Sequence, residues 1–371
     1  MDEQESPLEN MEGLKYTNDF WLNKKVFVTG HTGFKGVWLC LWLNKLGAKV
    51  KGYSLPPEKN SPFYDDSNLD DLIESEYGDI RDYVKLENSI KVFEPQIIFH
   101  LAAQALVIDS YLDPVNTFST NILGTVNLLQ ISKELNSLKS IVVVTTDKCY
   151  ENDESKISFN ELDKLGGSDP YSSSKSCCEL VVNSYRDSYL KKNNILIATA
   201  RAGNVIGGGD YSSNRLIPDL LKALTLEKEV VIRNPKSVRP WQHVLNPLEG
   251  YLILAENLFN GNSQFQGSWN FGPNIEDCKD VKWIVDNFNR KLKTPIKIVV
   301  KEDSENFKEA GFLFLDCTKA INNLNWNPIW DLEDAIKSII RWQETLAENK
   351  NIQNFCINEI EKYIKHGERI K

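Results

Sequence analysis

The chain has 371 residues, enough for about two domains or for one large domain with an attached lobe. Hydrophobic residues make up 41% and charged residues 26%, which is ordinary for a globular protein and argues against a disordered or fibrous chain. The net charge of -9 argues against nonspecific nucleic-acid binding, which needs a basic surface.

The cysteines and the apolar runs indicate the compartment, and the histidines bear on metal binding. The 7 cysteines are an odd number without a C-x-x-C pair, so we expect free thiols in a reducing compartment. The 4 histidines have no ligand spacing, so we expect no structural metal. No apolar run approaches the roughly 20 residues that span a bilayer, and residues 1–20 do not have the pattern of a secretory signal. We expect a cytoplasmic protein without a membrane or nucleic-acid partner.

The first predicted elements form a strand-helix-strand unit. After a polar tail at 1–20, which we expect to pack through Phe20 and Trp21, residues 24–30 predict a buried strand that ends in glycine. A loop follows, then a helical apolar pattern at 37–46 and a second strand at 48–54. Glycines at the turn of such a unit are the context that a dinucleotide-binding fingerprint requires.

Each glycine of the loop has a predicted task. Gly30 makes the tight turn, Gly33 lets the backbone approach a pyrophosphate, and Gly36 lets helix and strand pack closely. The helix N terminus supplies free N–H groups to the phosphates. The residues of the loop predicted to bind a cofactor are Gly30, Thr32, Gly33, Phe34, Lys35 and Gly36.

The alternation of strands and helices continues along the chain. We predict a strand end on an acidic residue within 78–82, a helix at 83–93, a strand and small-residue loop at 95–104, a long helix around 121–125, and strands at 140–145 and 195–200. This order predicts an α/β fold with a doubly wound parallel sheet, the Rossmann architecture. The strand ends add five predicted cofactor ligands, Asp79, Ile80, Leu101, Ala102 and Ala103.

The second half of the chain predicts a smaller C-terminal substrate-binding lobe. Residues 203–210 are too glycine-rich for a regular element and predict a loop near a ligand, whereas 267–272 predict a strand that returns to the first domain. A helix at 246–257 and a mainly helical segment at 276–371 complete the chain. We expect a tail at 1–20, a dinucleotide-binding domain at 21–206 with 244–275, and a lobe at 207–243 with 276–371.

Tyr171 and Lys175 are four residues apart, so on a helix their side chains lie on one face. A tyrosine with an ordinary pKa of about 10 is a poor base at neutral pH, and a neighbouring ammonium lowers that pKa. Such a tyrosine can take a proton from a substrate hydroxyl while hydride leaves the same carbon for a nicotinamide. Because this pair follows the strand at 140–145 and a glycine-rich turn unit, we predict a proton-transfer site in which Tyr171 and Lys175 also bind the cofactor.

Five segments resemble a known family over roughly residues 20–345. They are 28–36, 145–150, 169–175, 201–210 and 239–244, and they resemble the extended short-chain dehydrogenases/reductases, the NAD-dependent epimerase/dehydratase family. Within it the chain is similar to the nucleotide-sugar 4,6-dehydratases that act on CDP-glucose. The resemblance implies NAD as cofactor, CDP-glucose as the nucleotide-sugar substrate, and a homodimer or dimer of dimers.

The resemblance also implies the roles of the catalytic residues. Tyr171, with Thr146 and Lys175, would remove the C4 hydroxyl proton as hydride passes to NAD; water then leaves across C5 and C6, and hydride returns to C6. Asp147 would protonate the departing C6 hydroxyl, which requires a pKa raised by burial. Lys148 stands where related dTDP- and GDP-sugar dehydratases have a glutamate. It supports the CDP branch and leaves the C5 base open, because a lysine base needs a depressed pKa.

Several assignments stay open. The second strand lacks an acidic residue at 52–54, and Lys35 could accommodate a 2′-phosphate, so NADP is compatible with the local chemistry as well as NAD. Candidate substrate ligands are Gln104, Asn204, Arg215 and Arg239, the arginines because guanidinium matches phosphate oxygens. The alternative functions are a nucleotide-sugar 4-epimerase of the same fold and a non-catalytic NAD(P)-binding sensor.

Overall fold

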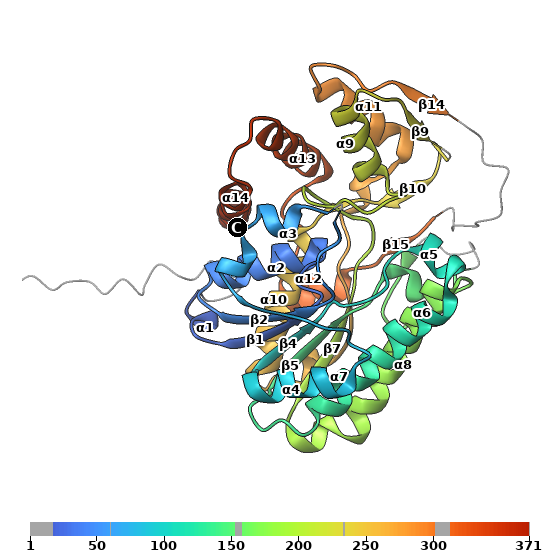
Figure 1. Ribbon diagram of the computed structural model, residues 1–371. Helices are drawn as coiled ribbons and strands as arrows, with labels where there is room; N and C mark the ends of the chain where they lie inside the picture. The colour runs from blue at the N-terminus through green and yellow to red at the C-terminus, as the bar shows by residue number, and fades with distance from the viewer. Residues whose placement is uncertain (1–17, 60, 153–157, 233, 301–311, 371) are drawn as a thin grey trace, which may run out of the picture.

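A parallel sheet forms the centre of the computed structural model, which describes residues 18–59, 61–152, 158–232, 234–300 and 312–370. The sheet is 7-stranded in the order β12-β7-β5-β4-β1-β2-β3 (Figure 1). Its strands are β1 Lys25–Thr29, β2 Lys49–Ser54, β3 Glu74–Tyr77, β4 Ile97–His100, β5 Ser140–Val144, β7 Leu196–Arg201 and β12 Gly267–Asn270. The strand order reverses between β1 and β4, so the predicted doubly wound Rossmann architecture is confirmed.

Helices cover both faces of the sheet, and alternate residues of each strand face opposite cores. Val26 and Val28 of β1 belong to one hydrophobic cluster, and Phe27 between them belongs to another. The first core contains α2 Phe34–Lys45 and α10 Leu245–Phe259; the second contains α4 Tyr83–Phe93, α7 Gly124–Ser132 and α8 Pro170–Ser188. Both faces being buried explains why the strands read as continuous apolar runs.

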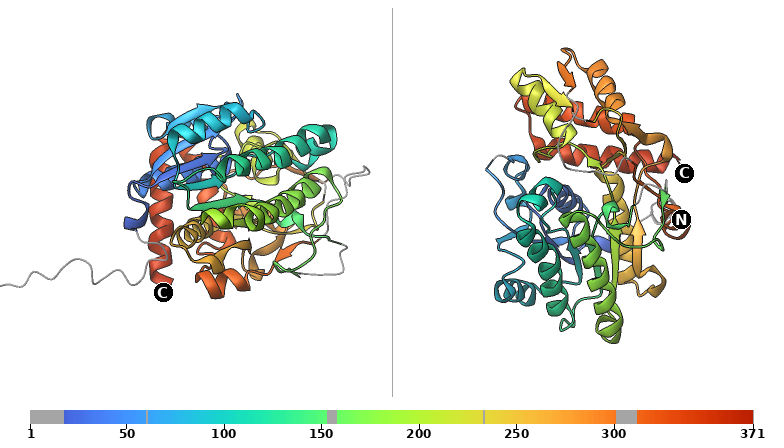
Figure 2. Two further views of the ribbon diagram at one scale, coloured as in Figure 1. Left: turned by 90° about the horizontal axis from the view of Figure 1, so that it is seen from below. Right: turned by 90° about the vertical axis from the view of Figure 1, so that its right-hand side faces the viewer.

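The smaller lobe lies at one end of the sheet and has its own core (Figures 1 and 2). It contains α9 Leu216–Leu226, β9 Val230–Ile232, β10 Val238–Pro240, β13 Cys278–Asp280, α11 Val281–Lys291, β14 Ile298–Val300 and α13 Leu332–Ala347. Ile217, Leu220, Phe288 and Ile336 are buried in that core. The remaining named helices and strands are α1 Asn18–Trp21, α3 Phe63–Asp66, α5 Val107–Leu112, α6 Pro114–Phe118, β6 Ser158–Phe159, β8 Val205–Ile206, β11 Gln242–His243, β15 Phe314–Leu315, α12 Thr318–Leu324 and α14 Ile352–Ile370.

Three local predictions need correction. The strand before 78–82 already ends at Tyr77, so the acidic residue lies beyond it. The predicted long helix is divided, because a π-helical turn at Ser119–Leu123 separates α6 from α7. The loop at 203–210 is interrupted by β8, in which the β-branched Val205 and Ile206 pair with β11. The pairing depends on residues almost forty positions away, which no local pattern reveals.

The predicted division into domains stays a proposal. Residues 1–17 lie outside the described residues, whereas Phe20 and Trp21 do pack onto the body: Trp21 is fully buried and stacks on Phe99. Within the segment at 276–371, α12 contacts α10 and α14 contacts α2, so part of this segment lies against the sheet domain.

The last helix, α14, closes over the first long helix of the chain. The ring centroids of Trp42 on α2 and Tyr363 on α14 lie 5.6 Å apart, and Lys45 and Glu361 form an ion pair of 2.6 Å. In the described part of the chain no helix is long and apolar enough to cross a bilayer. The cysteines at 40, 149, 177, 178, 278, 317 and 356 are free thiols, as predicted.

A buried ion pair joins α8 to the central sheet. Arg201 Nη2 lies 2.9 Å from Glu179 Oε2, with both side chains almost fully excluded from solvent. Thr145 Oγ1 and Thr199 Oγ1 donate to the same carboxylate at 2.6 and 2.7 Å, and Arg201 Nη1 donates to Tyr150 Oη at 2.8 Å. Glu179 follows Lys175 by one helical turn, so this network fixes the orientation of α8.

Glu179→Ala is expected to lower the free energy of unfolding by about 3–5 kcal/mol, because it leaves the buried Arg201 guanidinium unpaired. Urea unfolding followed by circular dichroism measures the loss. Glu361→Ala removes an exposed ion pair instead and should leave the unfolding midpoint nearly unchanged. Equal effects of the two substitutions would contradict a structural role for the buried pair.

Candidate active site

The glycine-rich loop after β1 forms a backbone cradle. A Cβ added to Gly36 would lie 2.0 Å from Gly30 O, and one added to Gly30 would lie 2.8 Å from Ala102 N, so neither position has room for a side chain. Gly30 also has a φ of +78°, which favours glycine. Gly33 is exposed and precedes α2, which has no side-chain N-cap. The first amides of α2 are therefore available to a phosphate group, and the cradle fits a dinucleotide.

The loops after β1 and β4 meet where the strand order reverses. Leu101 N and Ala102 N donate to Thr29 Oγ1 at 3.1 and 3.2 Å, which ties the two predicted cofactor segments together. Thr32 Oγ1 lies 2.7 Å from Ser54 Oγ, so the glycine-rich loop is also tied to the end of β2. Ligands of open α/β sheets bind at this kind of crevice.

The side chains of two other predicted cofactor residues already contact other residues of the protein. The Asp79 carboxylate binds the Arg81 guanidinium, with Nη2 to Oδ2 at 2.6 Å. Ile80 is buried and packs so closely on Gly124 that a Cβ there would lie 2.3 Å from Ile80 Cδ1. Ala103 follows Ala102 in the loop after β4 and is partly exposed.

Lys35 points toward the reaction end of the site. The charges that act on its ammonium are those of Arg215, Lys175, Asp147 and Asp210. Lys175 and Asp147 lie at the end of β5, whereas β2 lies on the other side of β1 in the sheet. A 2′-phosphate would lie at the end of β2. This placement disfavours the suggested role of Lys35 at a 2′-phosphate.

The predicted Tyr171 and Lys175 pair lies at the start of α8. Asp169 caps this helix by accepting from Ser172 N at 2.9 Å, and Pro170 occupies its first turn. Both Tyr171 and Lys175 are buried, one helical turn apart. Lys175 Nζ donates to Val144 O at 3.0 Å, which anchors the ammonium at the end of β5.

The pKa of Tyr171 differs from the prediction. Burial raises it to about 12, while the hydrogen bond with Thr146 and the charge of Arg215 act in the opposite direction. The expected lowering by Lys175 is wrong for the protein without ligands, because desolvation of the phenolate outweighs the nearby positive charges. Burial also lowers the pKa of Lys175.

Asp147 is the other candidate catalytic residue of the site. It is 1% exposed, and burial raises the pKa of its carboxyl, as predicted for a general acid. Thr146 Oγ1 donates to Asp147 Oδ1 at 3.1 Å and accepts from Lys148 N at 3.3 Å. Asp147 Oδ2 is buried without a hydrogen-bond partner among the described residues. A buried unpartnered oxygen is costly, so this atom is available to a ligand.

Gly203 leaves the space that the Asp147 carboxylate occupies. A Cβ added there would lie 1.6 Å from Asp147 Oδ2. Gly203→Ala is therefore expected to displace the carboxylate and to reduce turnover by about 100-fold or more, an effect typical of a misplaced acid-base group. Steady-state kinetics would show this change, and Gly261→Asn is the control, because an added Cβ meets nothing within 4 Å there and asparagine tolerates the left-handed backbone of this position, φ +83°. Full activity of Gly203→Ala would contradict the contact.

The predicted substrate ligands have different surroundings in the structure. Arg215 pairs with Asp210 at 3.2 Å, and the charge of Arg239 lowers the pKa of Asp147, so both arginines lie near the reactive groups. Asn204 has a φ of 42° beside Gly203. The side-chain amide of Gln104 instead closes a turn, with hydrogen bonds to both backbone groups of Leu106.

Sequence reasoning missed two residues that organise the site. Asp210 is buried and binds Arg215, and its only sequence signal is that it ends the glycine-rich segment. Asn121 is buried in the π-helical turn, where its Nδ2 donates to Ser174 Oγ at 2.8 Å and its Oδ1 accepts from Gln104 N at 2.8 Å. It thereby joins the loop after β4 to α8, and the irregular turn that places it has no signal in the sequence.

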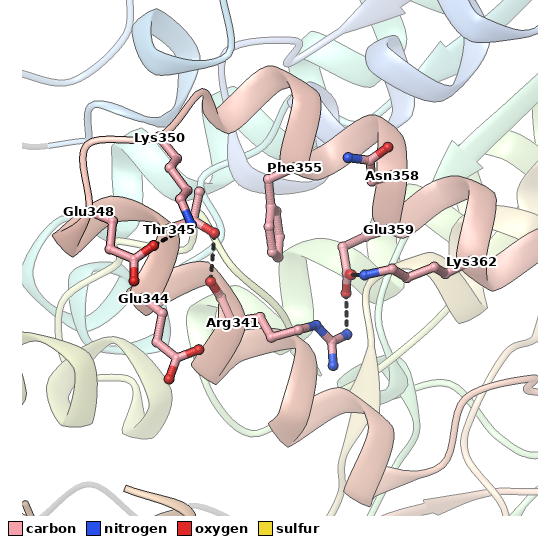
Figure 3. Close-up of a pocket in the computed structure, with 9 residues that line it drawn as sticks. All are labelled: Arg341, Glu344, Thr345, Glu348, Lys350, Phe355, Asn358, Glu359 and Lys362. Atoms are coloured by element: carbon pink, nitrogen blue, oxygen red, sulfur yellow. Dashed lines mark hydrogen bonds and ion pairs between the residues drawn. The ribbon is translucent and has the colours of Figure 1, made fainter. Parts of the chain in front are cut away.

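A surface pocket between α13 and α14 lies apart from these residues (Figure 3). Its central carboxylate, Glu359, accepts from Ser338 Oγ, Arg341 Nη2 and Lys362 Nζ at 2.6, 2.6 and 2.8 Å. Because side chains of the protein already bind the Glu359 carboxylate, we interpret these hydrogen bonds as a structural contact that holds α13 and α14 together.

Comparison with known proteins supports one family. The family model described as GDP-mannose 4,6 dehydratase matches residues 27–339. The CDP-glucose 4,6-dehydratase of Salmonella typhimurium is 45% identical over 352 residues, which cover 93% of this chain and 98% of that protein. The UDP-glucose 4-epimerase of Mycoplasma pneumoniae is 26% identical, over 70% of this chain and 79% of that protein.

A solved structure supports the fold independently. The dTDP-glucose 4,6-dehydratase of Bacillus anthracis, determined in complex with NAD, superposes with a TM-score of 0.73 and 22% identity, over 89% of this chain and 99% of that chain. The family match runs from β1 through α13 and so contains the glycine-rich loop, the buried acid and the Tyr171 helix. The chain therefore belongs to the GDP-mannose 4,6-dehydratase family of extended short-chain dehydrogenases/reductases.

Proposed function

We propose that this protein is an NAD-dependent 4,6-dehydratase that converts CDP-glucose to CDP-4-keto-6-deoxyglucose for deoxysugar biosynthesis. The observation that carries the proposal is Asp147, a buried acid with a raised pKa and a free oxygen, close enough to Tyr171 to influence its pKa. The 45% identity to a CDP-glucose 4,6-dehydratase supports CDP-glucose as the substrate.

The first half of the reaction is an oxidation at C4. NAD, when bound in the cradle after β1, supplies a reversible hydride acceptor. Tyr171 removes the C4 hydroxyl proton, with Thr146 and Lys175 as its neighbours in the site. Because the unliganded pKa of Tyr171 is about 12, the step requires a stabilised phenolate, and the positive charge of Arg215, which acts to lower this pKa, favours it.

The second half is the loss of water. A ketone at C4 acidifies the C5 hydrogen, and Asp147 gives its proton to the C6 hydroxyl as the C6–O bond breaks. Burial keeps this carboxyl protonated at a higher pH than an ordinary aspartate, which suits a general acid. Hydride then returns to C6, so no cofactor is consumed.

Substrate recognition is proposed for the residues that face this centre. Arg215 and Arg239 would bind the diphosphate, and Asn204 would contact the sugar or a phosphate through its amide. Gln104 stays a weaker candidate, because its amide is already hydrogen-bonded to Leu106. Cofactor contacts are proposed for the loops after β1, β3 and β4.

A 4-epimerase is the second candidate, since the chain also resembles UDP-glucose 4-epimerases. An epimerase needs the Tyr171 and Lys175 pair but has no leaving hydroxyl to protonate. The buried acid Asp147 therefore favours the dehydratase. A non-catalytic sensor is disfavoured, because it has no use for the reactive pair.

Product mass distinguishes these functions. The purified protein is incubated with CDP-, dTDP-, UDP- and GDP-glucose and NAD, without another oxidant. Loss of one water from CDP-glucose is the expected result, whereas unchanged mass with inverted C4 would mean an epimerase and no conversion would favour a sensor. Deuterium placed at C4 should be found at C6 of the product; its release to solvent would contradict the internal hydride return.

A dimer is proposed from an apolar surface on α5, α6 and α8, which lie side by side (Figure 1). Leu112 and Val115 are 76% and 77% exposed, and Leu180 of α8 and Leu123 of the adjoining π-helical turn are also exposed. The proposed occupant is the same surface of a second copy, since isologous contacts are self-complementary.

Val115→Glu is expected to convert the dimer to a monomer, because it places a charge in the apolar contact. Sedimentation velocity measures the change. Val92→Glu is the matched control, since Val92 is 80% exposed on α4, outside this surface. A protein that stays dimeric with Val115→Glu, or whose natural form is monomeric, would contradict the interface.

A further inference from the structure

Lys35 is a functional group that the cofactor cradle alone does not explain. It is the second residue of α2 and is half-buried. Its ammonium has no hydrogen bond or ion pair with any residue in the part of the chain that the structure describes. A lysine in a charged site without a fixed partner is free to exchange protons with a ligand.

Packing places the start of α2 against the reactive centre. A Cβ added to Gly207 would lie 3.1 Å from Phe34 Cζ, and Trp38 Nε1 donates to Gly208 O at 2.9 Å. Phe34 and Trp38 are one helical turn apart, so they dock α2 on the segment at 203–210. Gly203 at the start of that segment touches Asp147. The 203–210 segment therefore contacts both the start of α2 and the general acid.

The surroundings of Lys35 favour the neutral amine. Burial lowers its pKa to about 8, and the positive charges of Arg215 and Lys175 act in the same direction. The carboxylates of Asp147 and Asp210 act against them. At pH 7 about one tenth of Lys35 is thus unprotonated, far more than of an ordinary lysine. The requirement that a lysine base have a depressed pKa is met at this position.

We propose that Lys35 is the base that removes the C5 proton during the loss of water. The inference rests on the proposed dehydratase function. The Nζ lone pair takes the C5 proton and becomes an ammonium, and the C5–H electron pair is held as the enolate of the C4 ketone. This enolate then re-forms the ketone and makes the C5–C6 double bond as the C6–O bond breaks, and Asp147 protonates the departing oxygen to give water. When hydride returns to C6, the Lys35 ammonium returns a proton to C5, which balances the step.

Lys148 has a different electrostatic relation to the acid. Among the charged groups near Asp147, Lys148 has the largest effect on the pKa of this carboxyl, and it acts to lower it. Lys35 acts in the same direction on this carboxyl, with a smaller effect. Lys148 therefore suits the main countercharge for Asp147, whereas the lowered pKa of Lys35 suits a base.

The test compares Lys35→Met and Lys35→Arg with the natural protein, given CDP-glucose and NAD in heavy water. Both variants should still oxidise C4, seen as the near-ultraviolet absorbance of reduced nicotinamide. They should lose about 100- to 10,000-fold in the rate of water loss and in the incorporation of solvent deuterium at C5. Arginine keeps the positive charge but does not act as a base. NAD affinity, measured by calorimetry, should change less than about threefold.

A control substitution on the same helix shows whether the effects are specific to Lys35. Lys45→Met removes another lysine of α2, far from the site in an ion pair with Glu361, and should keep normal turnover. The proposal is overturned if Lys35→Arg eliminates water at the natural rate, if Lys35→Met fails to bind NAD or to oxidise C4, or if Lys148→Met alone blocks exchange at C5. Failure of the dehydratase function is recognised separately, because the natural protein itself would then release no water from CDP-glucose.

Discussion

Tyr171→Phe is expected to reduce CDP-glucose turnover by about 100- to 10,000-fold while NAD still binds, because phenylalanine has the shape of tyrosine but cannot accept the C4 proton. No reduced nicotinamide should form, since the blocked step is the oxidation itself. Rapid-mixing absorbance and calorimetric NAD binding measure the two properties. Turnover within a few-fold of the natural rate would refute the assignment of Tyr171 as the base.

The pH profile tests the same residue. With a pKa raised by burial to about 12, Tyr171 is protonated in the free protein at neutral pH. The phenolate fraction grows as pH rises toward that value, so the rate of C4 oxidation should increase with pH and the small residual rate of Tyr171→Phe should not. Tyr185→Phe, on the same helix and hydrogen-bonded to Gln130 outside the site, should keep the natural profile.

Asp147→Asn is expected to leave C4 oxidation intact and to slow the loss of water by about 100- to 10,000-fold, because an amide cannot protonate the leaving hydroxyl. Reduced nicotinamide should therefore accumulate after substrate is added. In the natural protein, water loss should decline as pH rises above the elevated pKa of Asp147, since the acid form is required. Absorbance and product mass, recorded together, separate the two steps.

The step at which the reaction stops distinguishes the Asp147 variant from the Lys35 variants. Asp147→Asn should still exchange the C5 proton with heavy water, whereas the Lys35 variants should not. Asp187→Asn is the control, because its carboxylate pairs with Arg186 near the surface of α8. Normal water loss by Asp147→Asn would mean that another group protonates the leaving hydroxyl.

The parts of the fold that local patterns determine could be predicted from the sequence. The strand at β1, the turn at Gly30 and the helix that carries Tyr171 and Lys175 are specified by apolar runs, glycine and helical spacing within short segments. The position of Asp147 at the end of a buried strand follows from the same reasoning. These features place the reactive groups at one edge of the sheet.

Other features depend on contacts between distant segments. The pairing of β8 with β11, the ion pair of Arg201 with Glu179 and the charges around Lys35 join residues that no short window contains. The pKa of Tyr171 could not be predicted either, because it depends on how completely the folded chain excludes water from the phenol. The sequence therefore indicated which groups are candidates for catalysis but not how the protein sets their protonation.

The contact of α14 with α2 has a consequence for how the protein is made. Trp42 is fully buried, and its ring is covered in part by Tyr363, which is synthesised more than three hundred residues later. While the ribosome is still adding the intervening chain, the side of Trp42 that Tyr363 later covers remains uncovered. Domains generally fold as they emerge, but here the first nucleotide-binding unit can reach its final packing only after Tyr363 has been synthesised.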